Sequence, residues 1–147
     1  MRTSACMAML LLPLFLSPAA AQHEVSPVEE SSCFAVSEDG QFLPDSVSHI
    51  RLILTGGDSL VLTWEPAIGI GTLGMEGEDG TDIWWVKGDL QPPITVGSDP
   101  PGAQDSERFS RSTLRPGARF QVILMDAAEE EEVTWACTRL FEVQTRH

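Results

Sequence analysis

Four carboxylates stand within seven residues of this chain and offer the ligand chemistry of a hard cation. Glu76, Glu78, Asp79 and Asp82 alternate with glycines in the stretch GMEGEDGTD. Carboxylate oxygens are the ligands that Ca²⁺ prefers, and glycines allow a loop to wrap around an ion. The spacing of these acids does not match the EF-hand pattern. A solvated loop in an acidic chain would explain the cluster equally well. A Ca²⁺ site here is one expectation, and a solvated loop is the other.

The neighbouring pair Trp84 and Trp85 offers contact with a protein or carbohydrate ligand. The pair lies in the run DIWWVK, which has the composition of a strand. Neighbouring residues of a strand point to opposite faces, so both rings cannot enter the same core. An outer ring could anchor a partner or stack on a sugar. The alternative is that loops cover it.

Other residues could hold haem or copper. Met75 together with a histidine could ligate haem iron, although an ordinary loop methionine explains it equally. If processing exposed His23 as the N-terminus, its amino group and ring could chelate copper with His49. These patterns define the alternative function, a small secreted or periplasmic metal- or haem-binding protein.

Catalytic patterns are missing from the sequence. It contains no H-E-x-x-H, no G-x-S-x-G and no phosphate-binding glycine loop. Three histidines, one of them the last residue, leave little for a catalytic triad. Acidic pairs are plentiful, but glycoside hydrolysis needs two carboxylates held in a cleft. We therefore expect a protein that is not an enzyme and carries no catalytic residue.

The first 21 residues have the pattern of a cleavable signal peptide. Arg2 precedes an apolar run over 5–16, and the small residues Ala19 to Ala21 end the segment. That run is shorter than the roughly 20 apolar residues that span a bilayer, and no second run of spanning length follows. We expect a secreted protein, extracellular or periplasmic, without a membrane span. An uncut N-terminal anchor is the alternative.

Two cysteines remain after such cleavage, Cys33 and Cys137. An even pair in an oxidising compartment most simply forms one disulfide. It would close a loop of roughly 100 residues and stabilise the fold by about 4 to 5 kcal/mol in the chain-entropy model. Free or intermolecular thiols are the alternative.

The charge balance narrows the class of partner. The chain has 22 acidic and 9 basic residues, a formal net charge of −13. Such a charge opposes binding to nucleic acid and to anionic membranes. It favours solubility or a cationic partner.

Apolar and polar residues alternate with period two along most of the chain, which predicts strands with one buried face. No segment has a convincing helical period. The glycine-rich stretch 67–82 is predicted as a long loop, or as a poorly formed strand around 68–73. Residues 88–105, with four prolines, are predicted as an extended loop. The predicted strands are 33–36, 50–55, 60–65, 82–87, 94–96 (an edge strand), 109–114, 119–125 and 133–144.

Short strands separated by turn signals indicate an all-β fold, a two-sheet antiparallel β-sandwich. The predicted organisation is a signal peptide over 1–21, an N-terminal leader over 22–46 that is loose over 22–32 and then has a short strand, and a sandwich domain over 47–147. Trp64 lies on the apolar face of its strand and should fill the space between the sheets.

Two motifs resemble those of fibronectin type III domains. The stretch Ser59–Pro66, SLVLTWEP, is similar to the family's second strand with its buried tryptophan. The stretch Leu114–Val122, LRPGARFQV, is similar to the L-x-P-G-x-x-Y-x-V signature entering the sixth strand, with Phe120 in the tyrosine's place. The resemblance covers about 47–145. It implies seven antiparallel strands in two sheets and a non-catalytic role in adhesion, recognition or spacing, and hence an exported binding module.

Overall fold

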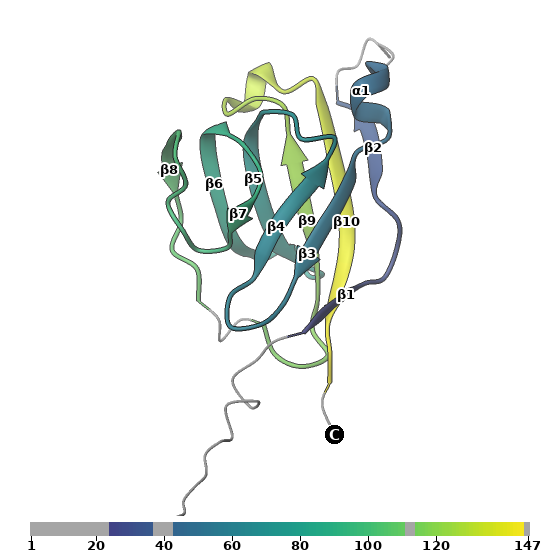
Figure 1. Ribbon diagram of the computed structural model, residues 1–147, viewed down its shortest axis with the longest axis vertical. Coiled ribbons are helices and arrows are strands. Elements are labelled where there is room, and N and C mark those ends of the chain that lie inside the picture. The colour runs from purple at the N-terminus through teal and green to yellow at the C-terminus, as the bar shows by residue number, and fades with distance from the viewer. Residues whose placement is uncertain (1–23, 37–42, 111–113, 146–147) are drawn as a thin grey trace, which may run out of the picture.

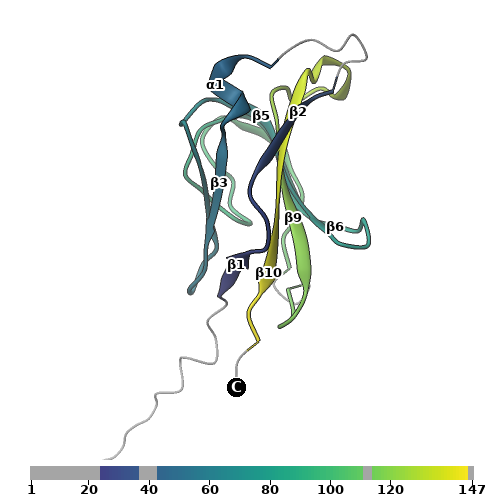
Figure 2. The ribbon, with the colours of Figure 1, turned by 90° about the vertical axis from the view of Figure 1, so that its right-hand side faces the viewer.

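The computed structural model describes residues 24–36, 43–110 and 114–145. The signal-peptide prediction and His23 therefore lie outside the described residues. Within them, all strand pairs are antiparallel and form two sheets that pack face to face (Figures 1 and 2). The predicted all-β, two-sheet sandwich is confirmed.

The small sheet has the order β3-β4-β7. Its strands are β3 (Arg51–Thr55), β4 (Val61–Glu65) and β7 (Ile94–Thr95). The glycines after Thr55 make the predicted hairpin turn, because Thr55 pairs with Val61 and Gly57 adopts a φ of 135°. The predicted edge strand near 94–96 is confirmed as β7.

The large sheet has the order β1-β10-β9-β5-β6-β8, and β2 also pairs with β10. Two short helical turns, α1 (Asp45–Ser48) and η4 (Glu130–Glu132), connect strands in the described chain. The strands of the large sheet are β1 (Val25–Pro27), β2 (Ser32–Ala35), β5 (Ile70–Gly77), β6 (Asp82–Leu90), β8 (Ala103–Ser106), β9 (Arg119–Met125) and β10 (Trp135–Val143).

The core lies between the inner faces of the sheets. Period-two alternation sends every second side chain of each strand inward. Trp64 of β4 is 1% exposed, and its indole N–H donates to the carbonyl of Ile68 at 2.7 Å. The position predicted for Trp64 is confirmed. Facing it from the large sheet are the buried side chains of Leu73, Met75, Trp84, Val86, Phe120, Val122, Leu124 and Phe141.

Of the two predictions for 67–82, the long loop is wrong for most of the stretch, and the alternative strand around 68–73 agrees in part with β5. Residues 70–77 form β5, which lies between β6 and β9 in the middle of the large sheet. Glycines lower strand propensity, but ladders on both sides and the inward side chains of Leu73 and Met75 outweigh it. Gly71 is required by packing, because a Cβ there would lie 2.2 Å from the backbone of Ala127.

Two further predictions along the chain are wrong. Residues 103–106 form β8 where an extended loop was expected, because Gly88 has no side chain and β8 can approach β6 closely. A Cβ on Gly88 would lie 2.3 Å from the carbonyl oxygen of Gly102. The strand predicted over 109–114 is not formed at Phe109, Ser110 or Leu114, and 111–113 lie outside the described residues.

Strands within the described residues 24–36 of the leader pair with the large sheet, so this part of the leader belongs to the sandwich. β1 pairs with the C-terminal half of β10, and β2, the short strand predicted near Cys33, pairs with its N-terminal half. The predicted disulfide is present, and it joins Cys33 to Cys137, which face each other across the two strands.

Between β1 and β2 the chain crosses to the edge of β3, where Leu52 N–H donates to the hydroxyl of Ser31 at 2.8 Å. The strands on either side of the predicted boundary at residue 47 thus share one sandwich. None of the helices in the described part of the chain has the length or apolar character needed to cross a membrane.

Candidate functional site

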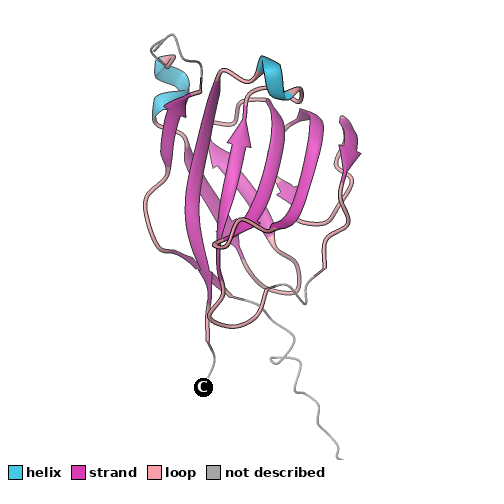
Figure 3. Cartoon of the chain, turned by 180° about the vertical axis from the view of Figure 1, so that it is seen from behind, coloured by secondary structure: helices cyan, strands magenta, loops and turns pink. Residues whose placement is uncertain are grey.

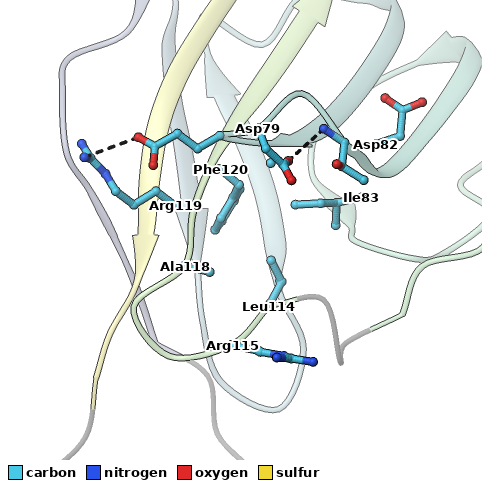
Figure 4. A pocket seen from close by; sticks show the side chains of 11 residues that line it. Asp79, Asp82, Ile83, Leu114, Arg115, Ala118, Arg119 and Phe120 are labelled. Carbon is cyan, nitrogen blue, oxygen red and sulfur yellow. Dashed lines mark hydrogen bonds and ion pairs between the residues drawn. The ribbon is translucent and has the colours of Figure 1, made fainter.

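A cavity of about 540 Å³ opens at one end of the sandwich (Figure 4). It lies between the turn joining β5 to β6 and the segment that leads into β9. Ile83, Leu114 and Phe120 are buried beneath it and form an apolar floor. Charged side chains of both signs stand around its rim: Glu78, Asp79 and Asp82 from the turn, and Arg115 and Arg119 from the other side.

The acidic stretch predicted as a cation-binding loop is the tight turn of the β5–β6 hairpin. Gly77 N–H donates to the carbonyl of Thr81 at 2.8 Å, and Gly80 N–H donates to the carbonyl of Gly77 at 2.9 Å. Gly80 has a φ of 88°, a conformation that glycine adopts without the steric penalty of a Cβ.

Two of the four acids are engaged by neighbouring residues. Glu78 pairs with Arg119, with Oε2 at 3.4 Å from Nη1. Asp79 accepts a hydrogen bond from the backbone N–H of Thr81 at 3.0 Å. That bond, and a second from the Thr81 side chain, hold the pKa of Asp79 below its usual 3.8, because they favour the ionised carboxylate.

The four carboxylates do not gather around a point. Glu76 lies on β5 between Gln121 of β9 and Asp82 of β6, and it does not line the cavity. The carboxylate of Asp82 points away from that of Asp79 (Figure 4). In the described parts of the chain, no three His, Cys, Asp or Glu side chains lie close enough together to hold a metal ion. The geometry of the described residues therefore does not support the expected Ca²⁺ site.

The residues considered for haem and copper are not brought together either. Met75 is 1% exposed and packs in the core, where β5 pairs with Trp84 of β6. An axial bond from its sulfur would require opening the sandwich. His49 is exposed directly after α1.

The two adjacent tryptophans point to opposite faces, as the strand pattern predicts. Trp84 is fully buried in the core, so it cannot contact a ligand. Trp85 lies half-buried on the outer face of the large sheet, and the ammonium of Lys87 stands 5.4 Å from its ring centroid. Of the pair, Trp85 alone is available for recognition.

Trp85 belongs to a broad area of uncharged residues on the outer side of the large sheet; this sheet faces the viewer in Figure 3. The register of the strands places outward residues in rows across β6, β5, β9, β10 and β2. We call this area the uncharged face. One row is Trp85, Gly74, Ile123, Thr138 and Ser32, and the next is Thr72, Met125, Ala136 and Phe34. Lys87 of β6 pairs with Thr72 and borders the uncharged face there, and Thr72 and Ala136 are buried.

Gly74 leaves a gap between Trp85 and Ile123 in the first row. A Cβ there would find its nearest neighbours at 3.9 Å, an ordinary contact, so packing does not demand glycine. A glycine inside a strand often marks a place where a ligand or another backbone approaches closely. Sequence reasoning missed the uncharged face as a whole, although the apolar outward positions Ile123 and Met125 signalled it.

Comparison with protein-family models, with curated protein sequences and with solved structures finds no match to this chain. What the chain does must therefore be inferred from its own residues.

Proposed function

We propose that this chain is an exported, non-enzymatic recognition module with a fibronectin type III-like fold, and that it binds a protein partner through the uncharged face. The observation that carries the proposal is the composition of that face. One complete row across five strands contains no charged residue, nor do the four residues of the next row from β5 to β2, in a chain with 22 acidic and 9 basic residues.

The composition of the uncharged face favours a protein partner. Protein interfaces are enriched in aromatic residues and methionine and depleted in Lys, Glu and Asp at their centre. Trp85, Met125 and Phe34 are of the enriched types, and tryptophans frequently contribute most to binding. A carbohydrate partner would stack on the Trp85 ring beside Gly74. Binding to a glycan array distinguishes such a partner from a protein.

The strand arrangement agrees with the fibronectin type III resemblance. Apart from β1, β2 and β8, seven strands remain in the described chain, with β3-β4-β7 facing β10-β9-β5-β6. Trp64 lies on the second of these seven strands. The motif beginning at Leu114 enters β9, the sixth. These correspondences support the fold part of the proposal.

Export is supported by the disulfide and by the signal-like N-terminus. A bond between Cys33 and Cys137 agrees with an oxidising compartment. If the proposal is right, the mass of the exported protein corresponds to a chain that starts at Gln22. A mass that still includes residues 1–21 in the exported fraction would contradict cleavage.

Site-specific photo-cross-linking in the cells that make the protein tests the binding surface. A photoreactive phenylalanine analogue replaces Trp85 in one variant and Thr63, which faces outward on the small sheet, in a matched control. We expect one discrete protein adduct from position 85 and none from position 63. The adduct should disappear when Met125→Glu is added, because it places an unpaired charge on the uncharged face.

Two results would overturn the proposed partner class. Equal cross-linking from positions 85 and 63 would show that the contact is not specific to the uncharged face. Binding to a glycan array that is lost in Trp85→Ala and unchanged in Thr63→Ala would assign the face to a carbohydrate instead.

A further inference from the structure

Most sheet edges of the described sandwich are protected against pairing with another chain. The outward backbone groups of β3 are occupied at Leu52, whose N–H donates to Ser31 and whose carbonyl accepts from Arg139. The edge strand β7 is only two residues long and follows Pro93. The edge strand β8 is four residues long and carries Asp105. Short strands, prolines and charges are the usual protections of an edge.

The last edge combines β1, which ends in Pro27, with β2, which is as short as β8 but carries neither a proline nor a charge. β2 and the residue after it read SCFAV, without charge or proline. Phe34 and Val36 are each 46% exposed, although most large hydrophobic side chains of the described residues are buried. Figure 2 views the sandwich from this side, and β2 faces the viewer unobstructed.

The register of β2 shows which of its backbone groups are unpaired. Val36 N–H donates to the carbonyl of Thr134 at 2.9 Å, so Val36, Phe34 and Ser32 direct their backbone groups toward β10. In an antiparallel pair the residues between them direct their N–H and C=O groups to the other side. Cys33 and Ala35 therefore direct their donors and acceptors to the open side of the edge, where no backbone group of the described residues pairs with them.

We propose that this edge pairs with β2 of a second copy of the chain, which joins two large sheets into one around a two-fold axis at Phe34. Around that axis Cys33 of one copy faces Ala35 of the other, and each such pair exchanges two backbone hydrogen bonds. The two Phe34 residues then stand opposite each other in the closer, non-hydrogen-bonded type of pair, where aromatic side chains stabilise a sheet.

The sequence of β2 is self-complementary in this register, which favours a second copy over an unrelated peptide. Ser32 of each copy faces Val36 of the other, and no charge enters the contact. This matters because a chain with a net charge of −13 repels its own copy elsewhere on its surface. A two-fold interface uses the same patch on both subunits, and this strand meets that requirement with Phe34 at its centre.

The disulfide prepares the edge for pairing. Cys33 lies in the middle of β2 and is bonded to Cys137 of the buried strand β10. The bond holds β2 in its extended conformation before a partner arrives, so little ordering cost remains to be met on association. Reduction should therefore weaken the dimer as well as the fold.

Sedimentation velocity on the oxidised, exported chain over a series of concentrations tests the dimer. We expect the weight-average mass to double as the concentration rises. Phe34→Lys, which opposes two charges at the axis, and Ala35→Pro, which removes an outward donor, should remain monomeric throughout. Val28→Lys is the control, since Val28 is also exposed, at 41%, but precedes β2; it should dimerise like the wild type.

Amide hydrogen exchange identifies the contact independently of mass. The amides of Cys33 and Ala35 should gain protection as the concentration rises. The amides of Phe34 and Val36, which already face β10, should not. Unchanged thermal unfolding of the variants, compared at a dilution where the wild type is monomeric, would show that they are folded. A wild-type chain that stays monomeric, a dimer that survives Ala35→Pro, or equal loss in Val28→Lys would overturn the proposal.

Discussion

Arg139 of β10 donates from Nη1 to the backbone carbonyl of Leu52 on β3 at 2.6 Å, and this bond links the two sheets. Its Nε donates to the carbonyl of Glu29 in the leader at 2.8 Å. The Arg139 side chain is only 6% exposed, so the charge is satisfied mainly by these bonds and by the distant carboxylate of Glu30 at 3.8 Å. One cation thus joins the large sheet, the small sheet and the leader.

Replacing Arg139 should destabilise the whole domain. Arg139→Met keeps much of the side-chain volume but leaves the carbonyls of Leu52 and Glu29 without their donor. We expect a loss of about 2 to 4 kcal/mol in the free energy of unfolding, measured by chemical denaturation. Arg51→Met, at an exposed position of β3, is the control and should change stability by less than about 0.5 kcal/mol. Similar losses in the two variants would contradict the role of Arg139.

The two tryptophans Trp64 and Trp85 should respond very differently to truncation. Trp64→Ala removes a fully buried indole and should cost roughly 3 to 5 kcal/mol of unfolding free energy. Trp85→Ala acts on the outer face and should cost much less, while it removes the proposed contact with a partner. Denaturation followed by circular dichroism measures both. A cost below about 1 kcal/mol for Trp64→Ala would mean that the ring does not fill the core.

The disulfide should contribute strongly to stability because it closes a long loop. Its cysteines are separated by 104 residues, which corresponds to about 4 to 5 kcal/mol in the chain-entropy model. We expect the double variant Cys33→Ala with Cys137→Ala to unfold at markedly lower denaturant concentration than the oxidised wild type. Reduced wild type should behave like the variant. A thiol assay that finds two free cysteines in denatured, unreduced protein would show that the bond does not form.

Two glycines of β5 should differ in their tolerance of alanine. Gly71→Ala places a methyl group against the backbone of Ala127 and should cost about 1 to 3 kcal/mol. Gly74→Ala meets only ordinary contacts and should be neutral or stabilise slightly, since alanine restricts the unfolded chain. Thermal unfolding of the pair checks this. A large loss for Gly74→Ala would mean that packing, and not ligand approach, keeps glycine there.

The pKa of Asp79 should lie below its usual value in the folded protein. Its folded pKa is depressed mainly by the Thr81 backbone N–H, so the small associated stability is present above pH 4 and is lost as pH falls through the folded pKa. A side-chain NMR titration should give a midpoint below 3.8 in the wild type. Thr81→Ala should raise the midpoint only in part, because the backbone donor remains. A wild-type midpoint at or above 3.8 would contradict the hydrogen-bonded turn.

The candidate sites were only partly predictable from the sequence. The period-two rule predicted that Trp84 and Trp85 would face opposite ways, but not which of them entered the core, because that depends on the register with β5. The acids and glycines of 76–82 indicated this stretch as a candidate site. The four carboxylates do not converge because Glu78 pairs with Arg119 and Asp79 accepts from Thr81, although the hairpin places Glu76 opposite Asp82.

The sequence by itself determined the class of the fold and much of its local structure. Alternation predicted β3, β4, β6, β9 and β10, glycines predicted the β3–β4 turn, and Trp64 was correctly placed in the core, because these features depend on neighbouring residues. Only the tertiary structure decided that β5, β8 and the described part of the leader form strands. Their glycines and polar residues have weak strand propensity, and ladders to distant strands, together with Arg139 and the disulfide, supply the free energy that orders them.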